Sequence, residues 1–309
     1  MKPRNDLAVW GAVTALSFAA FTTLAADKDR TTTESQNPTR ITTSEQRTDK
    51  KLGGVERANK LIGKTVISSD NQKLGRIENI VVDLESGRVL YAVIGTGPLG
   101  IGGHDYAVAP GMFTKTEGDN LHINMDKQKF TGAPEFTKDI DKPEQLNQAS
   151  FVHRVHEYFG QPAWWQGDKT AADTGSFHNV HKAKDAIGMK VKNVQDQDLG
   201  RVDNLMVDLP AGRVAYVILN PDSSLNLGND FLALPPMAFT SSSDRKYLVS
   251  DLNRDKLAAA PKFDKNQWSN LSDTGYASKV YQYYGKQAWF ETGGALRPTG
   301  RDNDKVYPK

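Results

Sequence analysis

Two pairs of histidines have a spacing that could bind a metal ion. His153 and His156 lie three residues apart in a segment with helical periodicity, and His178 and His181 repeat that spacing in a polar stretch. Histidines three apart share one side of a helix, as two zinc ligands would. However, the apolar stripe of the first segment is expected to face the core, which leaves the histidines at the surface. We therefore interpret all four as ordinary polar residues and predict no metal site.

Two glycine-containing strings are similar to phosphate-binding loops. Gly95-x-Gly97-x-x-Gly100 matches the dinucleotide fingerprint, but that fingerprint needs a helix directly afterwards, and Pro98 with further glycines disfavours one. Gly63-Lys64-Thr65 matches the end of a phosphate-binding loop, yet the residues that follow have the pattern of a strand. We interpret both strings as strand connections and predict no nucleotide cofactor.

The remaining chemistry is excluded on composition and pattern. Asp196-x-Asp198-x-Gly200 resembles the start of a calcium loop but lacks the downstream glutamate, so a turn is the better interpretation. The chain has no cysteine, which removes disulfides, thiolate catalysis and cysteine-rich metal sites. Its formal charge of +2 gives no electrostatic footprint for nucleic acid. We predict a protein that is not an enzyme and holds no cofactor.

The elements that position these residues come from an internal duplication. Leu74–Tyr91 and Leu199–Tyr216 are identical at eleven of eighteen positions, with a constant offset of 125 residues. A repeat of this length indicates two copies of a domain. Each copy alternates apolar and polar residues, turns at a glycine and continues as an apolar run, which predicts a β-hairpin.

Each hairpin carries the same turn motif, which we interpret as structural. An aspartate and an arginine bracket each turn, and hydrogen bonds within the turn or a partly exposed ion pair would explain them. The residues assigned to these motifs are Gly75, Asp83, Gly87 and Arg88 in the first copy, and Gly200, Asp208, Gly212 and Arg213 in the second.

Short strands around each hairpin predict a small closed barrel in each copy. An amphipathic helix follows each barrel, and an aromatic tail follows each helix. The tails contain Trp164 and Trp165 in the first copy, and Trp289 and Phe290 in the second. Aromatic residues suit interfaces, so these four are the candidate interaction surface. A small barrel would also use such residues to cover its own open end, and we favour packing within the chain for most of them. Trp165 and Phe290, the last in each tail, are expected to be the exposed anchors.

The fold class is therefore mainly β, with two tandem closed barrels. We expect them to be separate, so that one sheet running through both copies would contradict this arrangement. The predicted segments are 1–26 (signal peptide or membrane anchor), 27–57 (disordered polar tether), 58–165 (module 1), 166–183 (linker), 184–290 (module 2) and 291–309 (polar tail).

The N-terminal segment supports two alternatives. Lys2 and Arg4 precede an uncharged run over 7–26 that ends in small residues, which is typical of a cleaved signal peptide. The same run is also long enough to be a retained membrane anchor. Either alternative predicts that the remaining chain lies outside the cytoplasm, in the periplasm or anchored to the inner membrane and facing it.

Together these features resemble the PRC-barrel family. The resemblance rests on Leu61-Ile62-Gly63, Leu74-Gly75-Arg76, Val82-Asp83-Leu84, Gly87-Arg88 and Tyr91-Ala92-Val93, and on Ile187-Gly188-Met189, Leu199-Gly200-Arg201, Val207-Asp208-Leu209, Gly212-Arg213 and Tyr216-Val217-Ile218. It implies the fold but no catalytic residues, because the family has no shared catalytic set.

Two functions remain open. The first is a periplasmic binding or scaffolding protein whose two barrels present one surface to an envelope protein or complex. The alternative, by analogy with the photosynthetic reaction-centre H subunit of this family, is a membrane-anchored accessory subunit of an electron-transfer complex. That alternative requires the segment 7–26 to be retained.

Overall fold

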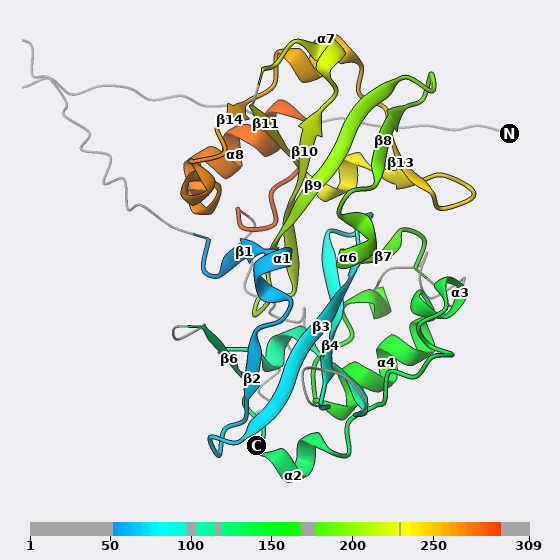
Figure 1. Ribbon diagram of the computed structural model, residues 1–309, viewed down its shortest axis with the longest axis vertical. Helices are drawn as coiled ribbons and strands as arrows, with labels where there is room; N and C mark the ends of the chain where they lie inside the picture. The colour runs from blue at the N-terminus through cyan, green and yellow to red at the C-terminus, as the bar shows by residue number, and fades with distance from the viewer. Residues whose placement is uncertain (1–51, 98–102, 115–118, 168–176, 229, 292–309) are drawn as a thin grey trace, which may run out of the picture. The chain divides into compact units, whose positions relative to one another are not determined.

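The computed structural model describes residues 52–97, 103–114, 119–167, 177–228 and 230–291 (Figure 1). The predicted signal peptide, most of the tether and nearly all of the C-terminal tail lie outside these residues. The described chain is mainly β, as predicted, and the two copies contain matching elements. We keep the names module 1 and module 2 for the copies.

The elements of module 1, with the strand and helix that lead into it, are β1 (Val55–Arg57), α1 (Ala58–Leu61), β2 (Thr65–Ile67), β3 (Lys73–Asp83), β4 (Arg88–Gly95), β5 (Asp105–Val108), η2 (Pro110–Met112), β6 (Asn120–His122), α2 (Lys127–Phe130), α3 (Pro143–Leu146), α4 (Ala149–Tyr158) and η3 (Trp164–Gly167).

The elements of module 2 are β7 (Val180–Lys182), α6 (Ala183–Ala186), β8 (Lys190–Asn193), β9 (Asp198–Asp208), β10 (Arg213–Pro221), η4 (Ser223–Leu225), β11 (Phe231–Leu234), η5 (Pro236–Ala238), β12 (Thr240–Ser241), β13 (Tyr247–Ser250), α7 (Arg254–Ala258), β14 (Lys262–Phe263), η6 (Trp268–Ser272) and α8 (Thr274–Tyr283).

The predicted hairpins are β3–β4 and β9–β10, and both contain the same irregularities. Each ladder shifts register at two equivalent places, and one of these shifts leaves Leu90 in β4 and Ala215 in β10 without a partner residue. A β-bulge of this kind leaves backbone groups outside the ladder. The repeated bulges show that the duplication extends to details of backbone geometry.

The first strand of each module pairs with the hairpin of the other module. β1 lies antiparallel to β9, with Val55 opposite Asp208, and β7 lies antiparallel to β3, with Val180 opposite Asp83 (Figure 1). The predictions of a disordered tether over 27–57 and a linker over 166–183 are therefore wrong at the C-terminal end of each segment. Residues there form strands that pair with the hairpin of the other module. Backbone donors and acceptors that would otherwise need water are paired there.

The exchanged segments are fixed by equivalent hydrogen bonds. The side-chain oxygen of Asn204 accepts from the N–H of Asn59 in α1 at 3.4 Å, and that of Asn79 accepts from the N–H of Lys184 in α6 at 3.3 Å. Both amide side chains are buried. Each hairpin thus caps the short helix that leads into the other module.

The two hairpins also meet directly, so the modules share one sheet. β10 pairs antiparallel with β4 through Arg213 and Arg88, and the strand order is β12-β13-β8-β9-β10-β4-β3-β2-β6, with the other strands paired at its sides. The prediction of two separate sheets is wrong, because backbone pairing runs from one module into the other. Closure of each copy into its own barrel is not confirmed, and the shared sheet is curled into barrel-like halves.

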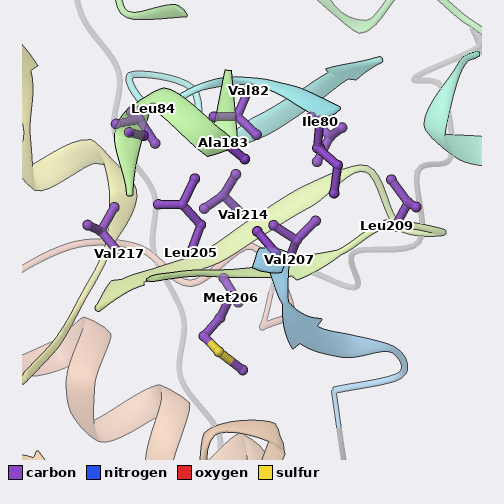
Figure 2. Packing of buried hydrophobic residues seen from close by; sticks show 14 of the residues in the cluster. Ile80, Val82, Leu84, Ala183, Leu205, Met206, Val207, Leu209, Val214 and Val217 are labelled. Carbon is purple, nitrogen blue, oxygen red and sulfur yellow. The ribbon is translucent and has the colours of Figure 1, made fainter. Parts of the chain in front are cut away.

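The core is continuous across this junction. Figure 2 shows Ile80 and Val82 of β3, and Leu84 directly after it, pointing toward Leu205 and Val207 of β9. All of these side chains are buried and belong to one hydrophobic cluster. Burying an aliphatic side chain of this size stabilises a fold by about 1.5–3 kcal/mol. The junction therefore has the character of a domain core.

The predicted amphipathic helices are α4 and α8, and each docks on the bulge of its own hairpin. His156 Nε2 lies 2.9 Å from the carbonyl oxygen of Leu90, and the hydroxyl of Tyr281 donates to the carbonyl oxygen of Ala215 at 2.9 Å. The bulge exposes these carbonyls to the helix, and the helix side chain satisfies them. Glycine ends both helices as predicted, with Gly160 and Gly285 at φ of +61° and +63°.

Candidate interaction surface at the junction of the two modules

The hairpin turns place Arg88 and Arg213 beside each other. Gly87 and Gly212 adopt φ of +64° and +63°, which glycine tolerates without strain, and the following arginine begins the outgoing strand. The two arginines are direct antiparallel partners across β4 and β10. Side chains of direct partners lie on the same face of a sheet. One arginine from each module therefore projects on one face at the junction.

The aspartates of the turn motif accept hydrogen bonds within their own turns. Asp83 accepts from the N–H of Ser86 at 3.1 Å and from its hydroxyl, and Asp208 accepts from the N–H of Ala211 at 3.1 Å. Asp208 also accepts from the N–H of Gly54 at 3.3 Å, which holds the segment leading into β1. The interpretation as turn hydrogen bonds is confirmed.

The other two glycines of the motif allow the strands to approach closely. A Cβ added to Gly75 would lie 2.1 Å from the carbonyl oxygen of Gly95, and one added to Gly200 would lie 2.2 Å from that of Asn220. Real Cβ atoms do not come this close to backbone oxygen. Gly75 and Gly200 are therefore required by the backbone path at the open end of each hairpin, far from the turn.

The aromatic tails reach the paired arginines. The guanidinium carbon of Arg88 lies 4.3 Å from the ring centroid of Trp164, and that of Arg213 lies 5.6 Å from the ring centroid of Trp289. Both distances are within the range of cation–π attraction. Because the arginines share a face, the tails of the two modules contact neighbouring residues on that face. We call Arg88, Arg213, Trp164 and Trp289 the Arg–Trp surface.

Electrostatics at this surface are set by burial and by like charge. Burial and the nearby charge of Arg213 lower the pKa of Arg88 to about 10, and burial also lowers the pKa of Arg213. Both groups remain positive at neutral pH. The Arg–Trp surface therefore combines two partly desolvated cations with two indole rings, and Asp83 and Asp208 are the residues directly opposite the two arginines on the neighbouring strands.

The expectation that the last aromatic of each tail is an exposed anchor is wrong for Trp165. Its exposed fraction is 4%, because its ring packs edge-on against His156 at 4.9 Å and against Phe177 at 5.8 Å. Phe290 is half-buried and packs on the ring of Tyr281 at 5.8 Å. Trp164 and Trp289 are likewise half-buried, in contact with the arginines.

The histidines lie in different environments from those predicted. His156 is buried on the bulge carbonyl, and His181 is buried in β7, where its Nε2 lies 2.8 Å from the hydroxyl oxygen of Ser241 and 3.0 Å from the side-chain oxygen of Asn179. The prediction that His153 and His156 lie at the surface is wrong for His156, and His153 is half-buried. His178, in the predicted linker, is exposed. In the ranges that the structure describes, no group of three or more histidines and carboxylates could hold a metal ion.

The loop-like strings take the conformations expected of connections. Thr65 begins β2, so no helix follows Gly63-Lys64. Asp196 lies in a turn at φ of +62° and forms an ion pair with Lys192 at 2.7 Å. Gly100 lies outside the described residues.

No local sequence pattern indicated the roles of Asn79, Asn204 or the hydrogen-bonded group formed by His181, Asn179 and Ser241. The 125-residue offset contains a signal for the exchanged strands, since it also aligns Val55 with Val180.

Comparison with known families agrees with this architecture. A family model described as the PRC-barrel domain matches residues 53–129 and again residues 178–256, together just over half of the chain. Both matches begin ahead of β1 and β7, so the exchanged strands belong to the family pattern. A search of curated proteins finds no match.

Proposed function

The chain belongs to the PRC-barrel family, and from that premise we propose that it is an exported, non-enzymatic binding or scaffolding protein of the cell envelope. The observation that carries the proposal is the meeting of Trp164 and Trp289 with the paired arginines on one face at the junction. This surface is the part of the protein that would hold a partner.

Residue chemistry supports this assignment. Tryptophan and arginine are enriched in protein interfaces and dominate binding energies there. They combine a large apolar area with donors that need a partner once water is removed. Rigidity supports it as well, because interfaces on pre-organised scaffolds lose less conformational entropy on binding. Here the exchange of β1 and β7 fixes the two halves of the surface relative to each other.

The proposal of export rests on the sequence of residues 1–26, which lie outside the described residues. No helix in the described part of the chain is long and apolar enough to cross a membrane. Cell fractionation and N-terminal sequencing of the mature protein test this part. A mature chain that begins at Ala26 or Asp27 in the periplasmic fraction is expected. A retained segment 7–26 in the membrane fraction would favour the accessory subunit of an electron-transfer complex instead.

The binding role is tested by capture from envelope extracts with the full chain as bait. The Trp164→Ala/Trp289→Ala double variant is expected to lose the partners that the wild-type chain retains. Tyr247→Ala is the matched control, because Tyr247 is a half-buried aromatic on β13, separated from β10 in the sheet by β8 and β9. Identical capture by the double variant and the wild type would contradict the assignment of the surface.

A further inference from the structure

The contacts at the junction of the two modules are reciprocal. The N–H of Val89 donates to the carbonyl oxygen of Gly212 at 3.0 Å, and the N–H of Val214 donates to the carbonyl oxygen of Gly87 at 3.0 Å. Donors and acceptors in the two bonds are related by the same offset of 125 residues. The bonds flank the pair of arginines at which β4 meets β10. An approximate twofold axis therefore passes between these strands.

The outer contacts follow the same relationship. β1 pairs with β9 as β7 pairs with β3, and the hydrogen bonds to α1 and α6 are equivalent. The N–H of Leu52 donates to the carbonyl oxygen of Ser272 at 2.7 Å, and that of Phe177 donates to the carbonyl oxygen of Asn147 at 2.8 Å. Reciprocal contacts of this kind define the interface of a twofold homodimer. The modules thus associate as two subunits would, although one chain contains both.

The side chains at the junction also match between the modules. Each equivalent pair is identical or exchanges one aliphatic residue for another, and all members are buried. The pairs are Ala58 with Ala183, Ile80 with Leu205, Val82 with Val207, and Leu84 with Leu209. None of the contacts given above requires the two modules to belong to the same chain. A second copy can therefore supply either half of the junction.

We propose that the junction face is an interaction surface for a second copy of this chain. Module 1 of one chain joins module 2 of the other, and the two remaining modules join in the same way to close a dimer. The dimer contains every junction contact twice, so each chain keeps the contacts that it has as a monomer. Each junction forms one Arg–Trp surface, so the dimer presents two and binds a partner with repeated sites more tightly.

The first test uses the purified full chain, refolded from denaturant at increasing chain concentrations and measured by size-exclusion chromatography with light scattering. A species of twice the chain mass is expected, and its share should rise with the chain concentration during refolding. Native monomers that are concentrated without unfolding should stay monomeric, because the junction must open before modules exchange. Monomers alone at every refolding concentration, or dimers formed directly from native monomers, would overturn the inference.

The second test traps the junction with a disulfide, which is possible because the chain has no cysteine. Arg88 and Arg213 are partners outside the ladder hydrogen bonds. Cα atoms of such partners lie about 4.5 Å apart, within the range of a disulfide. In the Arg88→Cys/Arg213→Cys variant, oxidised glutathione should link two chains in the dimer fraction and link within one chain in the monomer fraction. A denaturing gel without reductant separates these products by mass.

Arg88→Cys alone is the matched control and should link no chains, because Arg213 remains opposite position 88. Linked chains in this single variant would show module 1 paired with module 1, and would overturn the proposed exchange. A dimer fraction of the double variant without links between chains would place the contact outside the junction, with the same consequence. If the double variant fails to fold by circular dichroism, the refolding series of the wild type decides by itself.

Discussion

The side-chain oxygen of Asn204 in β9 accepts a hydrogen bond from the backbone N–H of Asn59, 145 residues earlier in the chain. It also accepts from the N–H of Leu205 at 3.1 Å, and its exposed fraction is 1%. Asn204→Ala removes the acceptor for the part-buried N–H of Asn59 in a helix of the other module and leaves the buried N–H of Leu205 without that acceptor. We expect a loss of about 1–2 kcal/mol in the free energy of unfolding. Denaturant titration measures it.

Asn220→Ala is the matched control for that substitution, because Asn220 is an exposed asparagine on the adjacent strand β10. It should leave the unfolding midpoint unchanged within about 0.5 kcal/mol. Equal stability of the Asn204 and Asn220 variants would show that the inter-module cap contributes nothing.

The second prediction concerns the contact between α8 and the bulge of β10. Tyr281→Phe removes the donor to the carbonyl oxygen of Ala215 and leaves a buried acceptor unsatisfied. We expect destabilisation of about 1–3 kcal/mol. Tyr276→Phe on the same helix is the control, because the Tyr276 hydroxyl is a buried atom without a hydrogen-bond partner. Removal of the Tyr276 hydroxyl should be neutral or stabilising. A larger loss of stability in Tyr276→Phe than in Tyr281→Phe would contradict the role assigned to the Tyr281 hydroxyl.

The third prediction is a pH dependence of stability that arises from His181. Burial and the charge of Arg245 lower its pKa to about 4, below the ordinary value of 6.5. The folded state therefore holds His181 neutral, while the unfolded chain binds a proton as the pH falls below about 6.5. The contribution of neutral, buried His181 to the free energy of unfolding is fully present above that pH. It is lost as the pH falls toward 4, at up to roughly 1.4 kcal/mol per pH unit.

Unfolding titrations between pH 7 and pH 4 check this prediction. His181→Gln should be less stable at pH 7 and should show a shallower decline toward low pH. His178→Gln, at an exposed site three residues earlier, should retain the wild-type slope. An unchanged slope in the His181 variant would assign the pH dependence to other groups.

The hairpins, their turns and the glycine ends of the tail helices could be predicted because local sequence determines them. Gly87 and Gly212 precede arginine at a turn that needs positive φ, and periodicity alone identifies α4 and α8. The exchange of β1 and β7 could not be predicted in the same way. A three-residue strand such as Val55–Arg57 buries little apolar area of its own, so the sheet that it joins is decided by tertiary packing.

The candidate surface likewise could be predicted from sequence only where local residues determine it. Sequence identified the tail aromatics, but the burial of Trp165 depends on Phe177, which lies beyond the tail in a segment interpreted as linker. The contacts of Trp164 and Trp289 with arginines depend on pairing between modules, which no local pattern records.

The central claim is that the two copies form one cooperative unit through exchanged strands and a shared core. Differential scanning calorimetry of the full chain and of Ile80→Ala tests it most directly, since Ile80 is a fully buried residue of β3 at the junction. We predict one transition with equal calorimetric and van't Hoff enthalpies, which Ile80→Ala shifts as a whole to lower temperature. Two transitions, of which the substitution moves only one, would contradict the account.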